Sequence, residues 1–257
     1  MMTDLWKSDA NWFATWFNTP AYHALYGARD EAEATRFIKA LTAKVMDADC
    51  QHVLDLGCGA GRHAAAFAEQ GKHAVGIDLS PNSIEAARSL YGEFDRLRFI
   101  EGDMRTLDEY VESNAFDAVS SLFTSIGYFE RDEDLTQTIT GVVQTLKTNG
   151  LFVLDFLNPA QVMQGLVEHE VKESGGYTFT IHRRMANGWI EKSIQYEDGS
   201  GIQHHVERVR ALTPDDWRER MHAVGLKVEA HYGDYALNPW REQAPRSILV
   251  ARKIPCG

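Results

Sequence analysis

Cysteine is scarce in this sequence of 257 residues, which contains only Cys50, Cys58 and Cys256. The number is odd, the three lie far apart and no CxxC pair occurs, so the sequence predicts neither a disulfide framework nor a structural zinc site. We expect no metal in the functional site. Free cysteines are typical of reducing compartments, and we therefore expect a cytoplasmic protein.

Basic residues are also few, with 26 Lys and Arg against 37 Asp and Glu and a formal net charge of −11. An acidic chain is a poor partner for nucleic acid or an anionic membrane surface, so we expect neither. Long apolar runs are missing as well, and none approaches the roughly 18 residues that a membrane span needs. The composition, 44% hydrophobic and 25% charged, is that of an ordinary globular protein.

The chain begins with a segment that we expect to be helical, residues 1–46. Trp12 and Trp16 are four positions apart and so share one face of a helix. We expect this helix to stop at Pro20, because proline interrupts a helix interior. An aromatic linker over residues 22–29 and a second helix would follow.

Short strands alternate with helices over residues 47–166. The expected strands are residues 52–56, 73–78, 97–101, 117–122 and 151–157. Strands separated by helices are connected by crossovers, which indicates a parallel sheet wound on both faces. This α/β segment is the expected cofactor-binding core.

The texture becomes all-β over residues 167–213, where glycine-rich turns separate strand-like runs. We expect a small antiparallel insertion there. Helical character resumes at Thr213 and Pro214, which are typical of a helix start. Residues 214–257 would then complete the core with a helix and a final strand pair.

Three glycines, Gly57, Gly59 and Gly61, lie where the first expected strand turns into a helix. Without Cβ atoms they let the backbone approach a ligand closely, and a nucleotide or its analogue is the expected ligand. A dinucleotide-binding loop needs glycine or alanine three residues after its second glycine, but Arg62 stands at that place. The pattern is instead GxGxG, with Asp55 two residues ahead of it.

Acidic residues end the next two strands of the same expected sheet. A carboxylate at Asp78 can accept two hydrogen bonds from ribose hydroxyls. Asp103 can accept from an adenine amino group while Met104 lies against the ring. Because open parallel sheets bind ligands at the carboxyl ends of their strands, we expect these side chains to meet at one site.

Five segments resemble, in order and spacing, the class I S-adenosylmethionine-dependent methyltransferases. They are residues 53–61, 76–80, 102–104, 116–119 and 150–155. The resemblance implies a doubly wound, mostly parallel, seven-stranded Rossmann-like sheet that the final strand pair closes. It also implies S-adenosyl-L-methionine as the cofactor.

Site residues follow from the same resemblance. The glycine loop would contact the methionine part of the cofactor, with Asp55 near its ammonium group, and Asp78 would hold the ribose. Leu79 would pack on the adenine, and Asp103 with Met104 would read its edge. Leu122 is assigned to the same cofactor site.

Two further segments, residues 123–129 and the aromatic residues 22–29, resemble methyltransferases that act on small molecules, including the amino-sugar N-methyltransferases of antibiotic pathways. In those relatives the aromatic segment folds over the cofactor as a lid. The resemblance therefore implies a helical N-terminal lid in which Tyr22, Tyr26 and Arg29 face the cofactor or the acceptor.

Methyl transfer from a sulfonium has a neutral leaving group, so the enzyme mainly has to align donor and acceptor in a dry pocket. The expected catalytic residues are Tyr22, Tyr128 and Asn158. Asn158 could only orient a substrate, since an amide takes no proton at neutral pH. Further candidates for a base are Asp155, His182, His204 and His205, although adjacent histidines in a strand point to opposite faces.

The sequence thus predicts an enzyme that transfers a methyl group to a nitrogen or oxygen of a small molecule, with a homodimer as one assembly open to it. A non-catalytic protein that binds S-adenosylmethionine stays open as an alternative. So does an NAD(P)-dependent oxidoreductase, which Arg62 and the final strand pair disfavour. The insertion is expected to roof the acceptor pocket or to form a dimer contact. The alternation of Tyr177, Phe179 and Ile181 favours the roof.

Overall fold

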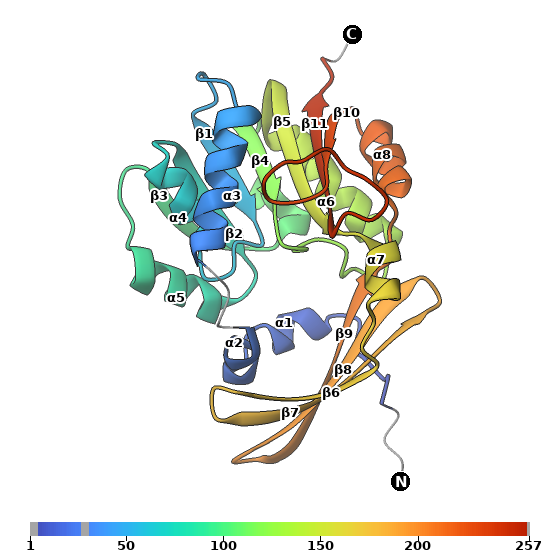
Figure 1. Ribbon diagram of the computed structural model, residues 1–257. Coiled ribbons are helices and arrows are strands. Elements are labelled where there is room, and N and C mark those ends of the chain that lie inside the picture. The colour runs from blue at the N-terminus through green and yellow to red at the C-terminus, as the bar shows by residue number, and fades with distance from the viewer. Residues whose placement is uncertain (1–4, 27–30, 256–257) are drawn as a thin grey trace.

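The computed structural model describes residues 5–26 and 31–255. It contains a seven-stranded sheet with helices on both faces and a separate four-stranded antiparallel sheet (Figure 1). The predicted fold class is confirmed. Within the described ranges, no helix is long and apolar enough to cross a membrane.

The large sheet consists of β1 (His52–Leu56), β2 (His73–Asp78), β3 (Leu97–Glu101), β4 (Phe116–Ser121), β5 (Leu146–Leu157), β10 (Leu226–Tyr232) and β11 (Arg246–Lys253). The small sheet consists of β6 (His169–Ser174), β7 (Tyr177–Ala186), β8 (Trp189–Asp198) and β9 (Gly201–Arg210). The helices are α1 (Trp12–Trp16), α2 (Pro20–Tyr26), α3 (Glu31–Lys44), α4 (Arg62–Glu69), α5 (Pro81–Tyr91), the 3-10 helix η1 (Met104–Glu109), α6 (Asp132–Thr145), α7 (Pro159–Gln164) and α8 (Pro214–Ala223).

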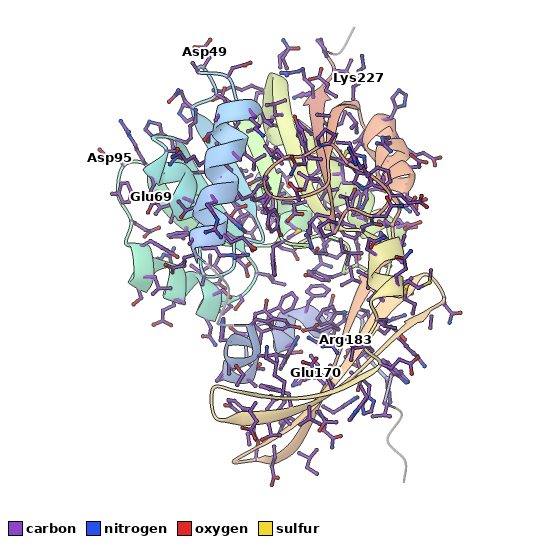
Figure 2. All side chains as sticks on the ribbon, in the orientation of Figure 1. Asp49, Glu69, Asp95, Glu170, Arg183 and Lys227 are labelled. Atoms are coloured by element: carbon purple, nitrogen blue, oxygen red, sulfur yellow. The ribbon has the colours of Figure 1, made fainter. Side chains whose placement is uncertain are left out.

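The strand order of the large sheet is β10-β11-β5-β4-β1-β2-β3. Strands β1 to β5 pair in parallel, whereas β11 is antiparallel to both β5 and β10. Asp49 and Asp95, which precede β1 and β3, lie at the end away from the small sheet (Figure 2). The carboxyl ends of these strands therefore face α1, α2 and the small sheet.

Local sequence explains several element boundaries. Ser80 caps α5 because its hydroxyl accepts a hydrogen bond from the amide of Ser83. Thr213 and Asp216 form a capping box at the start of α8. The buried alanines at positions 64, 65, 66 and 68 let α4 approach both α3 and the sheet. These starts were predicted from the sequence, because capping depends on neighbours in the chain.

Two predicted boundaries were wrong. Pro20 begins α2 instead of only ending α1, so the expected linker over residues 22–29 is helical as far as Tyr26. The missing proline N–H costs nothing in the first turn of a helix, where that donor has no partner within the helix. Strand β5 begins at Leu146 rather than at residue 151, and it passes through Asn149 at a φ of +63°.

The helices of the N-terminal segment fall into two groups. Helices α1 and α2 lie between the large sheet and the small one (Figure 1). Helix α3 packs on α4 and belongs to the layer that covers the large sheet. Toward α1 and α2 the small sheet presents buried Phe179 and Ile181, and the ring of His205 stacks on Trp16 with 4.5 Å between centroids. This apolar face packs against α1 and α2. These two helices, residues 12–26, are called the lid from here on.

Candidate active site

The glycine loop, residues 57–61, joins β1 to α4 and is held against the end of β2. The amide of Gly59 donates to Oδ2 of Asp78 at 2.8 Å. Oδ1 of the same carboxylate accepts from the amide of Ser80 at 2.9 Å. Asp78 therefore links the glycine loop to the start of α5.

The three glycines of this loop serve different purposes. At Gly57, with a φ of +66°, a Cβ would lie 2.5 Å from Cβ of Ser125. At Gly59 a Cβ would meet nothing within 4 Å, so the backbone there presents an open surface. At Gly61 a Cβ would lie 2.7 Å from the ring of Phe99, inside the protein. Gly61 thus serves helix packing and does not line the cavity described below.

Asp55 is a buried carboxylate at the base of the glycine loop, 2% exposed. Its Oδ1 accepts from Oγ of Ser120 at 2.9 Å, while Oδ2 has no hydrogen-bond partner among the described residues. Burial raises the pKa of Asp55 to about 7. A cationic group at the loop would stabilise the ionised form of this carboxylate.

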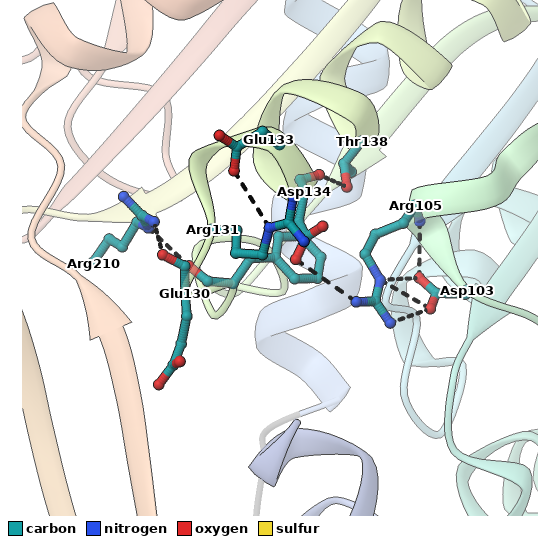
Figure 3. A network of polar contacts seen from close by, with 9 residues as sticks. Asp103, Arg105, Glu130, Arg131, Glu133, Asp134, Thr138 and Arg210 are labelled. Carbon is teal, nitrogen blue, oxygen red and sulfur yellow. Dashed lines mark hydrogen bonds and ion pairs between the residues drawn. The ribbon is translucent and has the colours of Figure 1, made fainter. Parts of the chain in front are cut away.

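Asp103 is bound by the side chain of Arg105 (Figure 3). Nε and Nη2 of Arg105 donate to Oδ1 and Oδ2 of Asp103 at 3.0 and 2.6 Å. Burial alone would raise the pKa of Asp103, but the hydrogen bonds from Arg105 outweigh it and lower that pKa. The guanidinium of Arg105 lies 5.9 Å from the ring centroid of Phe13 and 5.5 Å from that of Phe129. Asp103 is therefore ionised and joined to the lid through one side chain.

A buried polar cluster fixes the lid to the small sheet. Both carboxylate oxygens of Glu207 lie 2.7 Å from the hydroxyl of Tyr26, and Oε1 accepts from Nε1 of Trp16 at 2.6 Å. The ammonium of Lys192 donates to the Tyr26 hydroxyl and lies 3.7 Å from Oε2 of Glu207. Burial lowers the pKa of Lys192 although the charge of Glu207 opposes the change. These contacts hold Tyr26 in place.

The loop between β4 and α6 joins the glycine loop to the lid. Oγ of Ser125 donates to the carbonyl oxygen of Gly57 at 2.9 Å. The hydroxyl of Tyr128 donates to the carbonyl oxygen of Thr124, and the ring centroid of Tyr128 lies 5.3 Å from that of Phe17, the C-cap residue of α1. Arg210 holds the far end of the loop, because its Nε donates to the carbonyl oxygen of Phe129 and its Nη2 to that of Glu130 (Figure 3).

A cavity of about 410 Å³ lies between the lid and the carboxyl ends of the strands. The sequence-predicted residues that line it are Tyr22, Tyr26, Gly57, Gly59, Asp78, Leu79, Asp103, Met104, Leu122 and Tyr128. Residues from the lid, three strand ends and the β4–α6 loop thus meet, although they are far apart in the sequence. Asp55 and Gly61 do not line the cavity, and Arg29 lies outside the described residues.

Asn158 lies away from the cavity and serves the fold. Its Oδ1 accepts from the amide of Ala160 and caps α7, while its Nδ2 donates to the carbonyl oxygens of Glu242 and Ala244 at 3.0 and 2.8 Å. The expectation that it faces the substrate is corrected here. The two partners of its Nδ2 lie more than 80 residues along the chain, so no local pattern could reveal those contacts.

The other candidate bases are also engaged elsewhere. Asp155 is fully buried and its side chain accepts hydrogen bonds from Phe123, Tyr235 and Arg246. His204 pairs with Ser193, whereas His205 stacks on Trp16, so the two point to opposite faces as predicted. None of these side chains, nor His182, lines the cavity.

The sequence analysis missed several side chains that line the cavity. They are Phe13, Phe17, His23, Glu31, Arg62, His63, Phe123, Ser125 and Phe129, among others. Phe13 and Phe17, like Trp12 and Trp16, are four positions apart, which indicates a shared helix face but not what that face covers. Arg62 drew notice only because it excludes a dinucleotide loop. Its guanidinium lies 4.7 Å from the ring centroid of Phe123.

These residues fit a charged nucleotide-like cofactor. Gly59 leaves backbone open, Asp78 and Asp103 place carboxylates at two strand ends, and Oδ2 of Asp55 has no hydrogen-bond partner among the described residues. The cavity volume is within the range of small-molecule sites, which is roughly 300 to 1,000 Å³.

The comparisons with known proteins agree with this geometry. The family model for a methyltransferase domain matches residues 53–150. A glycine/sarcosine N-methyltransferase of Parasynechococcus marenigrum is 30% identical over 217 residues, which cover 82% of this chain and 73% of the relative. The chain belongs to the S-adenosylmethionine-dependent methyltransferases. The predicted family, enzyme class and cofactor are thereby confirmed, and the oxidoreductase alternative is set aside.

Two further similarities have lower sequence identity. A dTDP-3-amino-3,4,6-trideoxy-alpha-D-glucopyranose N,N-dimethyltransferase of Streptomyces venezuelae is 24% identical, and the match covers 70% of this chain and 77% of the relative. The solved structure of CalS10 with bound S-adenosylmethionine, an amino pentose methyltransferase from Micromonospora echinaspora, superposes with a TM-score of 0.63 at 24% identity, covering 91% of this chain and 97% of that one. The latter similarity shows the shared fold.

Proposed function

We propose that this methyltransferase transfers the methyl group of S-adenosylmethionine to an amino nitrogen of a small molecule. The observation that carries the proposal is an aromatic wall beside the glycine loop, formed by Phe13, Phe17, Tyr22, Tyr128 and Phe129. Aromatic faces attract cations such as an ammonium group. The names of two relatives, one a glycine/sarcosine and one an amino-sugar N-methyltransferase, support the choice of nitrogen.

At the cofactor end, we propose roles for the residues that the resemblance had assigned. S-adenosylmethionine supplies a sulfonium methyl group that a nucleophile takes by in-line displacement. The carboxylate of Asp78 would hold the ribose hydroxyls, and Leu79 and Met104 would pack on the adenine. Oδ2 of Asp55 would compensate the charge of the ammonium group through water or the loop backbone, because it is buried without a partner among the described residues.

At the acceptor end, we propose that tyrosines orient the amine. The Tyr128 hydroxyl donates its hydrogen bond to the carbonyl oxygen of Thr124, and the lone pairs of the Tyr128 oxygen can accept an amine N–H. The ring of Tyr22 packs against Phe17 with centroids 4.8 Å apart, which fixes it as part of the wall. An amine attacks in its neutral form, so a proton must leave. We propose His23, which lines the cavity, as the group that takes it.

Matched acceptors test this proposal. The purified protein is incubated with S-adenosylmethionine and with pairs of small molecules that differ only in an amino or a hydroxyl group, such as an amino sugar and its parent sugar. We expect S-adenosylhomocysteine to form with members of the amine series and not with the matched alcohols. Transfer confined to the hydroxyl compounds would overturn the choice of nitrogen.

We also propose a cytoplasmic homodimer that does not bind nucleic acid. The net charge of −11 opposes nucleic acid, and the two cysteines in the described ranges, Cys50 and Cys58, are free and buried. Outer strands β6 and β9 of the small sheet carry the exposed apolar side chains Val171 and Ile202, which a second copy could cover. Light scattering on the purified protein would decide the assembly, and a monomer mass would refute the dimer.

A further inference from the structure

Two consecutive residues of the β4–α6 loop have an unusual backbone conformation. Phe123 and Thr124 have φ angles of +59° and +64°, although neither is glycine. Side chains with a Cβ rarely adopt this left-handed region, and residues held there cluster at functional sites. The surrounding structure must hold such a turn in place.

The groups that hold the turn come from β5, from β11 and from the segment between β10 and β11. Oδ2 of Asp155 accepts from the amide of Phe123 at 2.8 Å, and the carbonyl oxygen of Asp155 accepts from the amide of Thr124 at 3.2 Å. Nε of Arg246 donates to Oδ1 of Asp155 at 2.8 Å, and Nη2 of Arg246 donates to Oγ1 of Thr124 at 3.2 Å. Tyr235 donates a further hydrogen bond to Oδ2 of Asp155 at 3.1 Å.

The turn at Phe123 and Thr124 also positions three side chains that line the cavity. Phe123 lines it, and Arg62 lies over its ring. Ser125 contacts the glycine loop through the carbonyl oxygen of Gly57, and Tyr128 donates to the carbonyl oxygen of Thr124. The carboxylate of Asp155 itself is 0% exposed and does not line the cavity.

We infer that Asp155 and Arg246 are positioning residues for methyl transfer. They hold the Phe123–Thr124 turn so that Phe123 and Tyr128 line the cavity beside the glycine loop, where donor and acceptor must align. This role rests on the proposed function, because it requires methyl transfer to take place in this cavity. It also explains why the closing strand β11, remote from the cofactor loop, carries a partly buried arginine.

The first test is Arg246→Lys, which keeps the positive charge but cannot donate to both Asp155 and Thr124. We expect kcat to fall about 10- to 100-fold, the loss that misplacement near the reacting groups causes. The KM of the acceptor and the dissociation constant of S-adenosylhomocysteine should change by less than about twofold, because the ground-state contacts remain. The control is Arg252→Lys on the same strand, whose exposed partner is Glu229. It should leave all three values unchanged.

A second readout does not depend on turnover. Amide hydrogen exchange of residues 122–129 should be faster in Arg246→Lys than in the parent, and unchanged in Arg252→Lys. Thr124→Val removes the hydroxyl that Arg246 contacts, whereas Thr124→Ser keeps it. The Val variant should therefore show faster exchange and lower kcat, and the Ser variant should recover both.

The outcomes separate the two proposals. If the parent transfers methyl groups to no amine, the proposed function fails, and the exchange comparison alone decides the positioning role. If Arg246→Lys does not fold, the Thr124 pair decides in its place. Parent-like kcat and parent-like exchange in Thr124→Val and in any folded Arg246→Lys would overturn the inference.

Discussion

Asp55 should cost the cofactor-free protein stability at neutral pH. Burial raises its pKa from 3.8 to about 7, so the folded protein binds this proton more tightly than the unfolded chain does. One pKa unit corresponds to about 1.4 kcal/mol, so the ionised group costs about 4 kcal/mol. Stability therefore falls as pH rises: the cost is absent below about pH 4, grows between pH 4 and 7, and is complete above pH 7.

Asp55→Asn removes the charge and keeps the size of the side chain, and its amide oxygen can still accept from Ser120. We expect this variant to be more stable than the parent by about 4 kcal/mol at pH 8. At pH 5 the gain should shrink to about 2 kcal/mol, because only the unfolded chain is then ionised. The same variant should bind S-adenosylmethionine more weakly at pH 8, since it lacks the charge proposed to face the ammonium group.

Urea denaturation of the cofactor-free protein at the two pH values measures these differences. Asp117→Asn is the matched control with the opposite sign. Burial alone would raise the pKa of Asp117, but hydrogen bonds from Lys147 and two backbone amides outweigh it and lower that pKa. Asp117→Asn should therefore be less stable than the parent above about pH 4, where the parent gains stability from the ionised carboxylate. A gain for Asp55→Asn that does not depend on pH, or no gain at all, would refute the reasoning.

Three other substitutions probe the site. Asp78→Ala should weaken binding of S-adenosylhomocysteine by about 1.5 to 3 kcal/mol, because a charged acceptor is lost. Calorimetry on the folded variant checks this, and an unchanged affinity would make Asp78 purely structural. Glu207→Gln should lower the free energy of unfolding by about 2 to 3 kcal/mol, since buried Lys192 loses its counter-charge; parent-like urea curves would argue against it. His23→Gln should remove the acidic limb of the pH profile of kcat while cofactor affinity stays the same, and a profile that keeps this limb would exclude His23 as the proton acceptor.

The cofactor half of the cavity could be predicted because its signals are local. The strand before the glycine loop, the loop itself and the Ser80 cap each depend on neighbouring residues, and the parallel topology then brings Asp78 and Asp103 to one edge. Even here local reasoning had a limit. Gly61 belongs to the same pattern as Gly59, yet it faces Phe99 inside the protein rather than the cavity.

The acceptor half could not be predicted in the same way, because its contacts join distant segments. Asp155 and Asn158 were expected near the substrate because they lie near the end of the expected strand 151–157. Their partners are Arg246 and the carbonyls of Glu242 and Ala244, about 90 residues further along the chain. Glu207 drew no notice in the sequence, since only the packing of the small sheet on the lid brings it to Tyr26.

Transfer of an isotopically labelled methyl group tests the central claim most directly. The protein is incubated with S-adenosylmethionine that carries a trideuterated methyl group and with an amine that the matched panel has identified as an acceptor. The account predicts that mass spectrometry and NMR find the label on the amino nitrogen, with one S-adenosylhomocysteine formed for each label transferred. Label on oxygen or carbon, or S-adenosylhomocysteine formed without a labelled amine, would contradict it.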